Sequence, residues 1–203
     1  MNKGLIRDTV SLFLITAIAG LLLGAVYMIT EEPIAKQKQK QKEAAYKEVF
    51  SDAESFEALD ISDSGSVLEA AGYVATEVTI NEVMMAKKGT ETIGYVMKVT
   101  THEGYAGDIE LACGIRNDGT VNGISFLSIG ETAGLGMKAK DDVFKNQFAS
   151  KQVNQFIATK SGASAPEDID AITGATITTN AVTKAVNGCL SYFKSLEGGA
   201  VNE

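Results

Sequence analysis

Histidine and cysteine are scarce in this chain of 203 residues, which has one histidine, His102, and two cysteines, Cys113 and Cys189. No Cys-x-x-Cys pair occurs, and these two residue types supply most ligands of protein zinc sites. The sequence therefore predicts no metal centre of its own. Both cysteines stand among apolar or small residues, so they are either two buried thiols or a disulfide outside the cell. His102 is expected in a turn at the surface.

Charge is absent from residues 9–30, which contain no Asp, Glu, Lys or Arg. At about 1.5 Å per helical residue, this stretch spans the roughly 30 Å hydrocarbon core of a bilayer. It predicts one transmembrane helix. A cleaved signal peptide is the alternative, but the apolar run is longer than a typical h-region and Ala17-Ile18-Ala19 lies in its middle. Gly20 and Gly24 form a Gly-x-x-x-Gly pair that is compatible with close approach of another helix.

Basic residues flank the apolar stretch unequally, because Lys3 and Arg7 precede it and five lysines between positions 36 and 47 follow it. A plain positive-inside count would place the following domain in the cytoplasm, but large domains translocate largely regardless of charge. Residues 51–203 contain 11 basic and 21 acidic residues, a formal charge of −10. Such a domain repels phosphate backbones, so we expect no nucleic-acid partner.

A helical stalk is expected over residues 31–50, because Pro33 is tolerated in a first helical turn and the rest is rich in Lys, Gln, Glu and Ala. Tyr46, Val49 and Phe50 are spaced to dock the end of this helix on a core. Residues 51–72 are acidic, with a short helix expected over Ser55–Leu59 and no site.

Period-two patterns and turn residues begin at Tyr73 and predict a series of strands. Lys88-Gly89 and Asn117-Asp118-Gly119 read as hairpin turns between neighbouring strands. The order favours an α+β fold, an antiparallel sheet with peripheral helices, over a doubly wound parallel sheet. The expected strands cover residues 73–80, 83–87, 92–101, 108–115 and 120–128.

Two further elements are expected after this sheet. Residues 140–149 predict a helix with Val143, Phe144, Gln147 and Phe148 on one face, and residues 153–157 predict a short strand or extended segment.

The segment Asp170–Thr179 precedes an amphipathic pattern that predicts the last helix over residues 177–195. A small turn at Gly174 and Ala175 would then deliver the Thr176 hydroxyl to a helix N-terminus, where free N–H groups and the helix dipole favour a phosphate. Thr178 and Thr179 would add hydroxyl donors, and Asp170 would cap the turn or bind a metal carried by a modifying enzyme. The alternative is an ordinary helix capped by Thr176 or Thr173.

Two glycine loops interrupt the predicted strands, one at residues 104–109 and one at residues 130–137. Repeated glycines let main chain approach a flat ligand, and Tyr105, Leu135 and Met137 are suited to cover a ring. Glu131 and Thr132 would supply polar contacts in the second loop. The alternative is that both loops are plain turns between elements.

The run Asp170-Ala-Ile-Thr-Gly-Ala-Thr176 resembles the recognition motif of a flavin transferase, which uses FAD to attach FMN through a phosphoester to the final threonine. That motif belongs to FMN-binding domains found in the G subunit of the Rnf ferredoxin:NAD complex and in the C subunit of the sodium-translocating NADH:quinone reductase. The Gly-Tyr-x-Gly and Glu-Thr-x-Gly-Leu-Gly segments resemble the same family. Ala133 is a departure, because the family often has proline there.

The resemblance implies a cofactor site with no catalytic residue of its own and with FMN bound covalently to Thr176. The other residues that it assigns to FMN are Asp170, Thr173, Gly174, Ala175, Thr178, Thr179, Tyr105, Gly107, Glu131, Thr132, Gly134, Leu135 and Gly136. It also implies a plasma-membrane complex with other membrane and iron-sulfur subunits, in which electron flow between ferredoxin and NAD drives export of Na⁺ or H⁺. A flavin transferase would mature the chain.

The implied organisation has five parts along the sequence. Residues 1–8 form a cytoplasmic end, 9–30 the transmembrane helix, 31–50 the stalk, 51–196 an extracytoplasmic FMN-binding domain and 197–203 a frayed C-terminus. The short chain favours the G subunit of the Rnf complex over the C subunit of the quinone reductase. A stand-alone membrane flavoprotein and a non-redox binding or assembly module are also compatible with the sequence.

Overall fold

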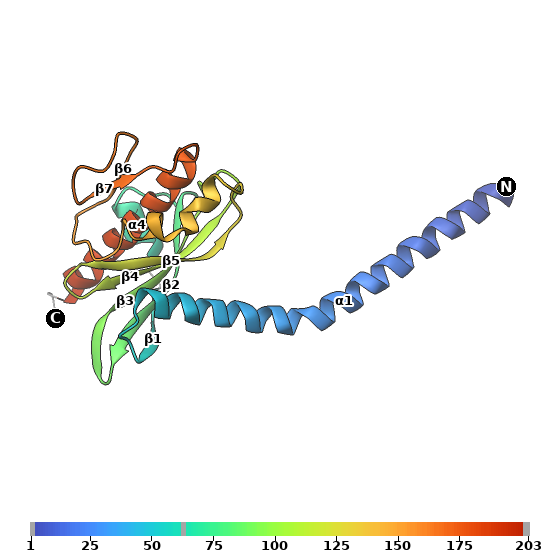
Figure 1. Cartoon of the computed structure of the whole chain (residues 1–203). Helices are drawn as coiled ribbons and strands as arrows, with labels where there is room; N and C mark the ends of the chain where they lie inside the picture. Colours follow the sequence, from blue (N-terminus) through green and yellow to red (C-terminus); the bar gives the residue numbers. More distant parts are fainter. Residues whose placement is uncertain (1–2, 62–63, 201–203) are drawn as a thin grey trace. The chain divides into compact units, whose positions relative to one another are not determined.

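The computed structural model describes residues 3–61 and 64–200; of the predicted frayed end at 197–203, residues 197–200 continue the last helix and residues 201–203 lie outside the described part. The chain divides into two compact units, one that ends at Lys42 and one that begins at Glu43. A single helix, α1 (Lys3–Val49), provides the whole first unit and the first residues of the second (Figure 1). The N-terminal end at residues 1–2 lies outside the described part.

Helix α1 contains the apolar stretch that the sequence predicts to cross a membrane, and it is long and apolar enough to do so. None of the side chains in that apolar window is buried within the chain. The helix continues through Pro33 as far as Val49, so the residues of the predicted stalk continue the apolar helix. Tyr46, Val49 and Phe50 are buried, as their spacing predicts.

A five-stranded antiparallel sheet forms the centre of the second unit, with each strand beside its neighbour in sequence (Figure 1). Its hairpin turns at residues 89–90 and 117–120 follow the predicted turn sequences. The antiparallel sheet with flanking helices confirms the predicted α+β fold. The strands are β1 (Ser55–Leu59), β2 (Val78–Lys88), β3 (Glu91–Thr101), β4 (Ile109–Arg116) and β5 (Val121–Ile129).

Two predictions about the sheet are wrong. Residues 55–59 form strand β1 and not a helix, because they pair with β2 from Ser55 opposite Lys87 to Leu59 opposite Val83. The strands predicted at 73–80 and 83–87 are one strand, β2, with an irregularity between Ile80 and Glu82. One extra residue in a strand reverses its alternation, which places Ile80 and Val83 on the same face and made the pattern look interrupted.

The remaining elements lie around the sheet and differ from prediction mainly at their ends. The helix expected over 140–149 is split, because Asp141 is extended. On its predicted buried face, Phe144 and Phe148 are buried but Val143 is 84% exposed. The strand expected over 153–157 begins only at Ile157, and the last helix extends beyond residue 195. These elements are α2 (Ser64–Ala70), η1 (Gly136–Lys140), α3 (Asp142–Lys145), β6 (Ile157–Thr159), β7 (Asp168–Asp170) and α4 (Thr176–Ala200).

Helix α4 covers one face of the sheet and buries the larger hydrophobic core. Val182, Val186 and Leu190 of α4 belong to this core together with apolar residues of all the strands from β2 to β5. Cys113 on β4 and Cys189 on α4 are both buried free thiols. Burial and the neighbouring Cys113 raise the pKa of the Cys189 thiol, so this thiol remains protonated.

Candidate functional site

A pocket of about 530 Å³ opens beside the first turn of α4. Residues from all three motifs singled out in the sequence line this pocket, although up to about 70 positions separate them along the chain. The lining residues are Tyr105, Glu131, Thr132, Leu135, Gly136, Gly174, Ala175, Thr176, Ile177 and Thr178.

The turn before α4 delivers Thr176 to the pocket as the first residue of the helix. Gly174 adopts a φ of 78°, in the left-handed region that glycine tolerates best. The Ala175 N–H donates to the Ile172 carbonyl at 2.9 Å, which closes the turn. Thr179 holds the turn from inside the helix, since its hydroxyl accepts from the Ile172 N–H at 3.1 Å and donates to the Ala175 carbonyl at 3.0 Å.

These bonds separate the roles of the three threonines. Thr179 is fully buried, and its hydroxyl already donates to the Ala175 carbonyl within the turn. This hydroxyl therefore has no proton left to donate to a phosphate, which was its predicted role. Thr176 is partly exposed at the pocket wall, and Thr178 is buried against it. The first N–H groups of α4 have no acceptors within the helix and lie on this side, where an anion would satisfy them.

Gly136 allows the second loop to pass very close to α4. A Cβ atom at this position would lie 2.6 Å from Thr178 Oγ1 and 2.7 Å from Glu131 Oε2, and real carbon atoms do not approach so closely. The absence of a side chain therefore lets the loop, the buried Glu131 and the helix meet at one point. Close approach, and not an unusual backbone angle, is the requirement for glycine here.

The first glycine loop closes the opposite side of the pocket. Its Ala106 N–H donates to Glu131 Oε1 at 3.4 Å, which joins the two glycine loops. Tyr105 on this loop is 69% exposed, and Leu135 on the other loop is 43% exposed. Large apolar side chains that line a pocket yet remain exposed are suited to cover a flat apolar ligand.

Besides Thr179, four residues of the predicted cofactor set lie outside the pocket wall. Gly107 and Gly134 shape the two loops, with φ values of 115° and 77°. Thr173 is exposed in the turn. The Asp170 carboxylate accepts from the Ala163 N–H, and the Asp170 N–H donates to Gln147 Oε1 at 2.6 Å, so Asp170 organises the approach to the turn.

Ile177 is a pocket residue that the sequence motifs did not single out. It is 52% exposed in the first turn of α4 and lines the pocket next to Thr176. A signal was present, because Ile177 is a large apolar residue outside the stripe formed by Val182, Val186 and Leu190. An apolar residue in the first turn of a helix that faces away from the core indicates a contact with a group outside the core.

A larger groove of about 710 Å³ lies near the other end of α4 and contains none of the predicted residues. Its wall combines Asp118, Asn154, Glu167 and Lys194 with parts of Leu190 and Phe193. We assign the site to the smaller pocket, because only there do a helix N-terminus, a hydroxyl and exposed apolar side chains occur together.

Comparison with known proteins gives two family matches along the chain. Residues 1–49 match an RnfG N-terminal region, and residues 104–191 match an FMN-binding domain. The second match begins at the first glycine loop and includes all three segments of the pocket.

Several curated relatives extend over most of the chain. The G subunit of the Na(+)-translocating ferredoxin:NAD(+) oxidoreductase complex of Acetobacterium woodii is 33% identical over 91% of this chain and 89% of its own length. The G subunit of the proton-translocating complex of Clostridium ljungdahlii is 33% identical over 95% and 97%. Among solved structures, the C subunit of the Na(+)-translocating NADH-quinone reductase of Parabacteroides distasonis is 24% identical, with a TM-score of 0.49 over 70% of this chain and 77% of its own.

Proposed function

Because the chain belongs to the G-subunit family of ion-translocating ferredoxin:NAD(+) oxidoreductase complexes, we propose that it is a membrane-anchored electron-transfer subunit with FMN in the pocket beside α4. The observation that carries this proposal is the convergence of three separate motifs on one pocket at a helix N-terminus. The pocket offers a hydroxyl and free N–H groups at one point and exposed apolar side chains around it. A phosphate attached to a flat ring system has the same two-part chemistry.

Thr176 is the proposed attachment point for the FMN phosphate. A flavin transferase would form the bond between Thr176 Oγ1 and the phosphorus of the FMN half of FAD, with AMP as the leaving group and a base of the transferase as acceptor of the hydroxyl proton. The resulting phosphodiester carries one negative charge. At the start of α4 the helix dipole stabilises such a charge by about 0.3–1 kcal/mol.

The rest of the pocket would bind and orient the ring. Tyr105, Leu135 and Ile177 provide the apolar surface that covers it, and Gly136 lets main chain lie close to it. When bound, FMN supplies one- and two-electron redox chemistry that protein side chains lack. The contribution of the chain is attachment, exclusion of water and the charge around the ring, and none of its residues acts as a nucleophile in turnover.

The proposed setting is a plasma-membrane complex with other membrane and iron-sulfur subunits. Helix α1 would anchor the chain, and the FMN-binding domain at residues 51–196 would lie outside the cytoplasm. Electron flow between ferredoxin and NAD in that complex would drive export of Na⁺ or H⁺. The names of the relatives support this setting, and the apolar helix supports the anchor.

The test is the intact mass of the full chain produced together with a flavin transferase, followed by peptide mapping. We expect a mass gain equal to one FMN less one water, located on Thr176. The Thr176→Ala variant should lose the adduct completely but keep its stability within about 0.5 kcal/mol, because the lost hydroxyl is only partly buried. Thr92→Ala, on β3 away from the pocket, is the matched control and should retain the adduct.

Two results would contradict the proposal. One is a folded wild-type chain without adduct beside a competent transferase, which would make Asp170–Thr176 a plain helix cap in a binding or assembly module. The other is undiminished covalent flavin in Thr176→Ala, which would move the attachment to another residue.

A further inference from the structure

We propose that His102, the single histidine of the chain, is a positioning residue whose protonated imidazole fastens the loop that carries Tyr105 at the pocket. The fastening itself depends only on contacts within the chain. Its effect on a bound ring rests on the proposed function.

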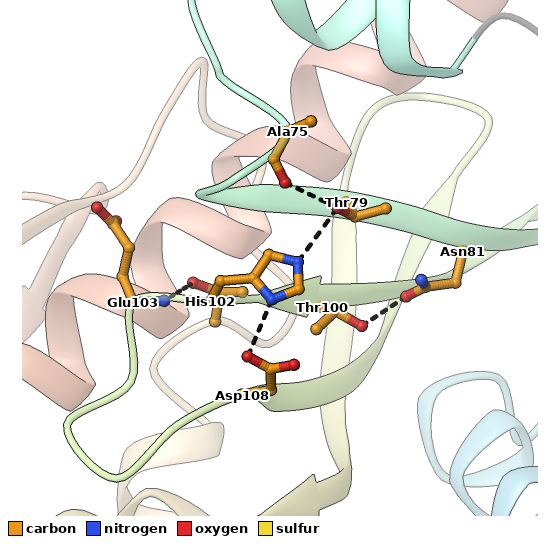
Figure 2. A network of polar contacts seen from close by, with 8 residues as sticks. Ala75, Thr79, Asn81, Thr100, His102, Glu103 and Asp108 are labelled. Atoms are coloured by element: carbon orange, nitrogen blue, oxygen red, sulfur yellow. Dashed lines mark hydrogen bonds and ion pairs between the residues drawn. The ribbon is translucent and has the colours of Figure 1, made fainter.

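Both ring nitrogens of His102 have partners on different segments (Figure 2). Nδ1 lies 2.9 Å from Oδ1 of Asp108, and Nε2 lies 3.3 Å from the hydroxyl of Thr79 on β2. That hydroxyl in turn donates to the carbonyl of Ala75 at 3.2 Å. His102 and Asp108 stand at the two ends of the loop, so their pairing closes its base.

Counting protons shows which form of the imidazole fits these contacts. A carboxylate only accepts, so the bond to Asp108 requires a proton on Nδ1. The Thr79 hydroxyl has one proton, which is given to Ala75, so the bond to Thr79 requires a second proton on Nε2. Only the doubly protonated, positively charged ring satisfies all three bonds together. A neutral ring keeps two of them, because Thr79 must then donate either to the ring or to Ala75.

Other charged residues lie along the backbone next to His102. Glu77 precedes β2, and its carbonyl accepts from the His102 N–H at 3.0 Å. Glu103 follows His102 in the loop. Lys184 on α4 contacts both of these carboxylates at 2.9 Å and so balances part of their charge. The charged side chain that contacts the imidazole itself is Asp108, with Oδ1 2.9 Å from Nδ1.

The loop that this pair closes forms one wall of the pocket. Between His102 and Asp108 it contains Tyr105, which lines the pocket, and Ala106, whose N–H donates to Glu131. Gly104 is packed tightly, since a Cβ there would lie 2.2 Å from the Gly107 carbonyl oxygen. A change at the base of so compact a loop is therefore transmitted to Tyr105.

The consequence is that the two partners of the ring hold the loop to different degrees. With one proton, on Nδ1, the bond to Asp108 remains and a bond of Thr79 is lost, either to the ring or to Ala75. Loss of the Asp108 bond, which closes the base, corresponds to about a tenfold fall in the ratio of fastened to released loop.

The first arm of the test needs no flavin. The full-length Thr176→Ala chain is labelled with ¹⁵N-histidine in detergent micelles, and long-range ¹H–¹⁵N spectra report which nitrogens of the single ring carry protons. We expect two slowly exchanging N–H protons on the charged ring and one, on Nδ1, on the neutral ring. Thr79→Val should remove the protection of the Nε2 proton. Thr100→Val is the matched control, because Thr100 on β3 donates to Asn81 and not to His102.

The second arm uses the chain loaded with FMN and measures quenching of flavin fluorescence by acrylamide, a neutral probe. Quenching should be up to about tenfold stronger in His102→Ala than in the wild type if release of the loop fully exposes the ring. His102→Gln is the matched control, because it keeps a donor for Asp108, and its quenching should stay near the wild-type value.

The outcomes separate this inference from the proposed function. A ring that never shows two protected N–H protons overturns the fastening, and so does quenching in His102→Ala that equals the wild-type value. Absence of covalent flavin overturns the proposed function, while the histidine spectra still decide the fastening.

Discussion

The two faces of the central sheet are covered in different ways. On one face, α4 packs along several strands and buries large side chains from β2 to β5. On the other face, the covering element is the end of α1, and the fully buried sheet residues in that cluster are Ala86, Val96 and Ala112. Gly94 on β3 and Gly114 on β4 form a slot there, since a Cβ at these positions would lie 2.6 Å and 3.1 Å from the ring of Phe50.

The difference teaches how the domain divides its tasks. The α4 face combines the main core with the pocket, because the same helix supplies Val182 and Val186 to the interior and Thr176 to the site. The α1 face seats one aromatic ring between strands, with the Arg116 guanidinium 5.5 Å from the ring centre. One face therefore contains the pocket, and the other joins the domain to the stalk.

The largest effect on stability is expected from Phe50→Ala, which empties the slot. The ring is completely buried, and removal of such a side chain costs about 3–5 kcal/mol because glycine neighbours cannot fill the space. Urea unfolding of the full chain in detergent measures the loss. Val143→Ala, at an exposed apolar side chain of α3, is the control and should change little.

The comparison also requires that Phe50→Ala spare the site. The fraction that remains folded should keep covalent flavin with an unchanged absorption spectrum. A shifted spectrum in the folded fraction would show that the two faces are coupled.

A smaller loss of stability, but a larger change in the pocket, is expected from Gly136→Ala. The added Cβ would overlap Thr178 and Glu131, and overpacking of this kind costs about 1–3 kcal/mol. Because the second glycine loop must move, the flavin absorption maximum and its midpoint potential should shift. Gly123→Ala, on β5 with open space around the added atom, is the matched control. Unchanged flavin properties in Gly136→Ala would contradict the assignment of this loop to the pocket.

The smallest effect concerns Glu48, near the end of α1, which joins the stalk to the domain. Burial alone would raise the pKa of its carboxyl, but hydrogen bonds from Lys145 and Ser125, both at 2.6 Å, lower it overall. A lowered pKa gives stability that is present above the ordinary glutamate pKa of about 4.3 and is lost as the pH falls through the folded value. Since the Glu48 side chain is 49% exposed, the contribution should stay below about 1 kcal/mol.

Urea unfolding across this acidic range measures the contribution of Glu48. The wild type should lose more stability than Glu48→Gln as the pH falls, and the two curves should converge once the carboxyl is protonated. Parallel curves at all pH values would assign no role to this ion pair.

Much of the fold and site follows from the sequence for identifiable reasons. The uncharged run of α1, the hairpin turn at residues 117–119 and the periodicity of α4 are local signals, and each element formed where its signal lies. The three segments that line the pocket were singled out together by their resemblance to one family, because capped helices and plain turns use the same residue types. Thr176 is the first residue of α4, so it lies at a helix N-terminus as the sequence predicts.

The parts that were missed depend on contacts between distant residues. Strand β1 has no strong pattern of its own and takes its conformation from the edge of β2. The irregularity beside Asn81 reverses the alternation of β2, so a strict period of two divides one strand into two. The hydroxyl of Thr179 is used within the turn, and the exposure of Ile177 at the pocket depends on how the loops lie over α4. The first three cannot be read from a single segment, whereas Ile177 left a partial signal as an apolar residue outside the core stripe of α4.

The order of the strands has a consequence for synthesis of the chain. Each strand pairs with the next one in sequence, so a nascent chain that has emerged as far as Ile129 already contains the whole sheet. It does not yet contain α4, which begins 47 residues later at Thr176. Until that helix leaves the ribosome, the apolar face that it covers is open to solvent or to a chaperone. The pocket does not exist at that stage, and any modification that reads the folded pocket must wait for translation to reach the C-terminal helix.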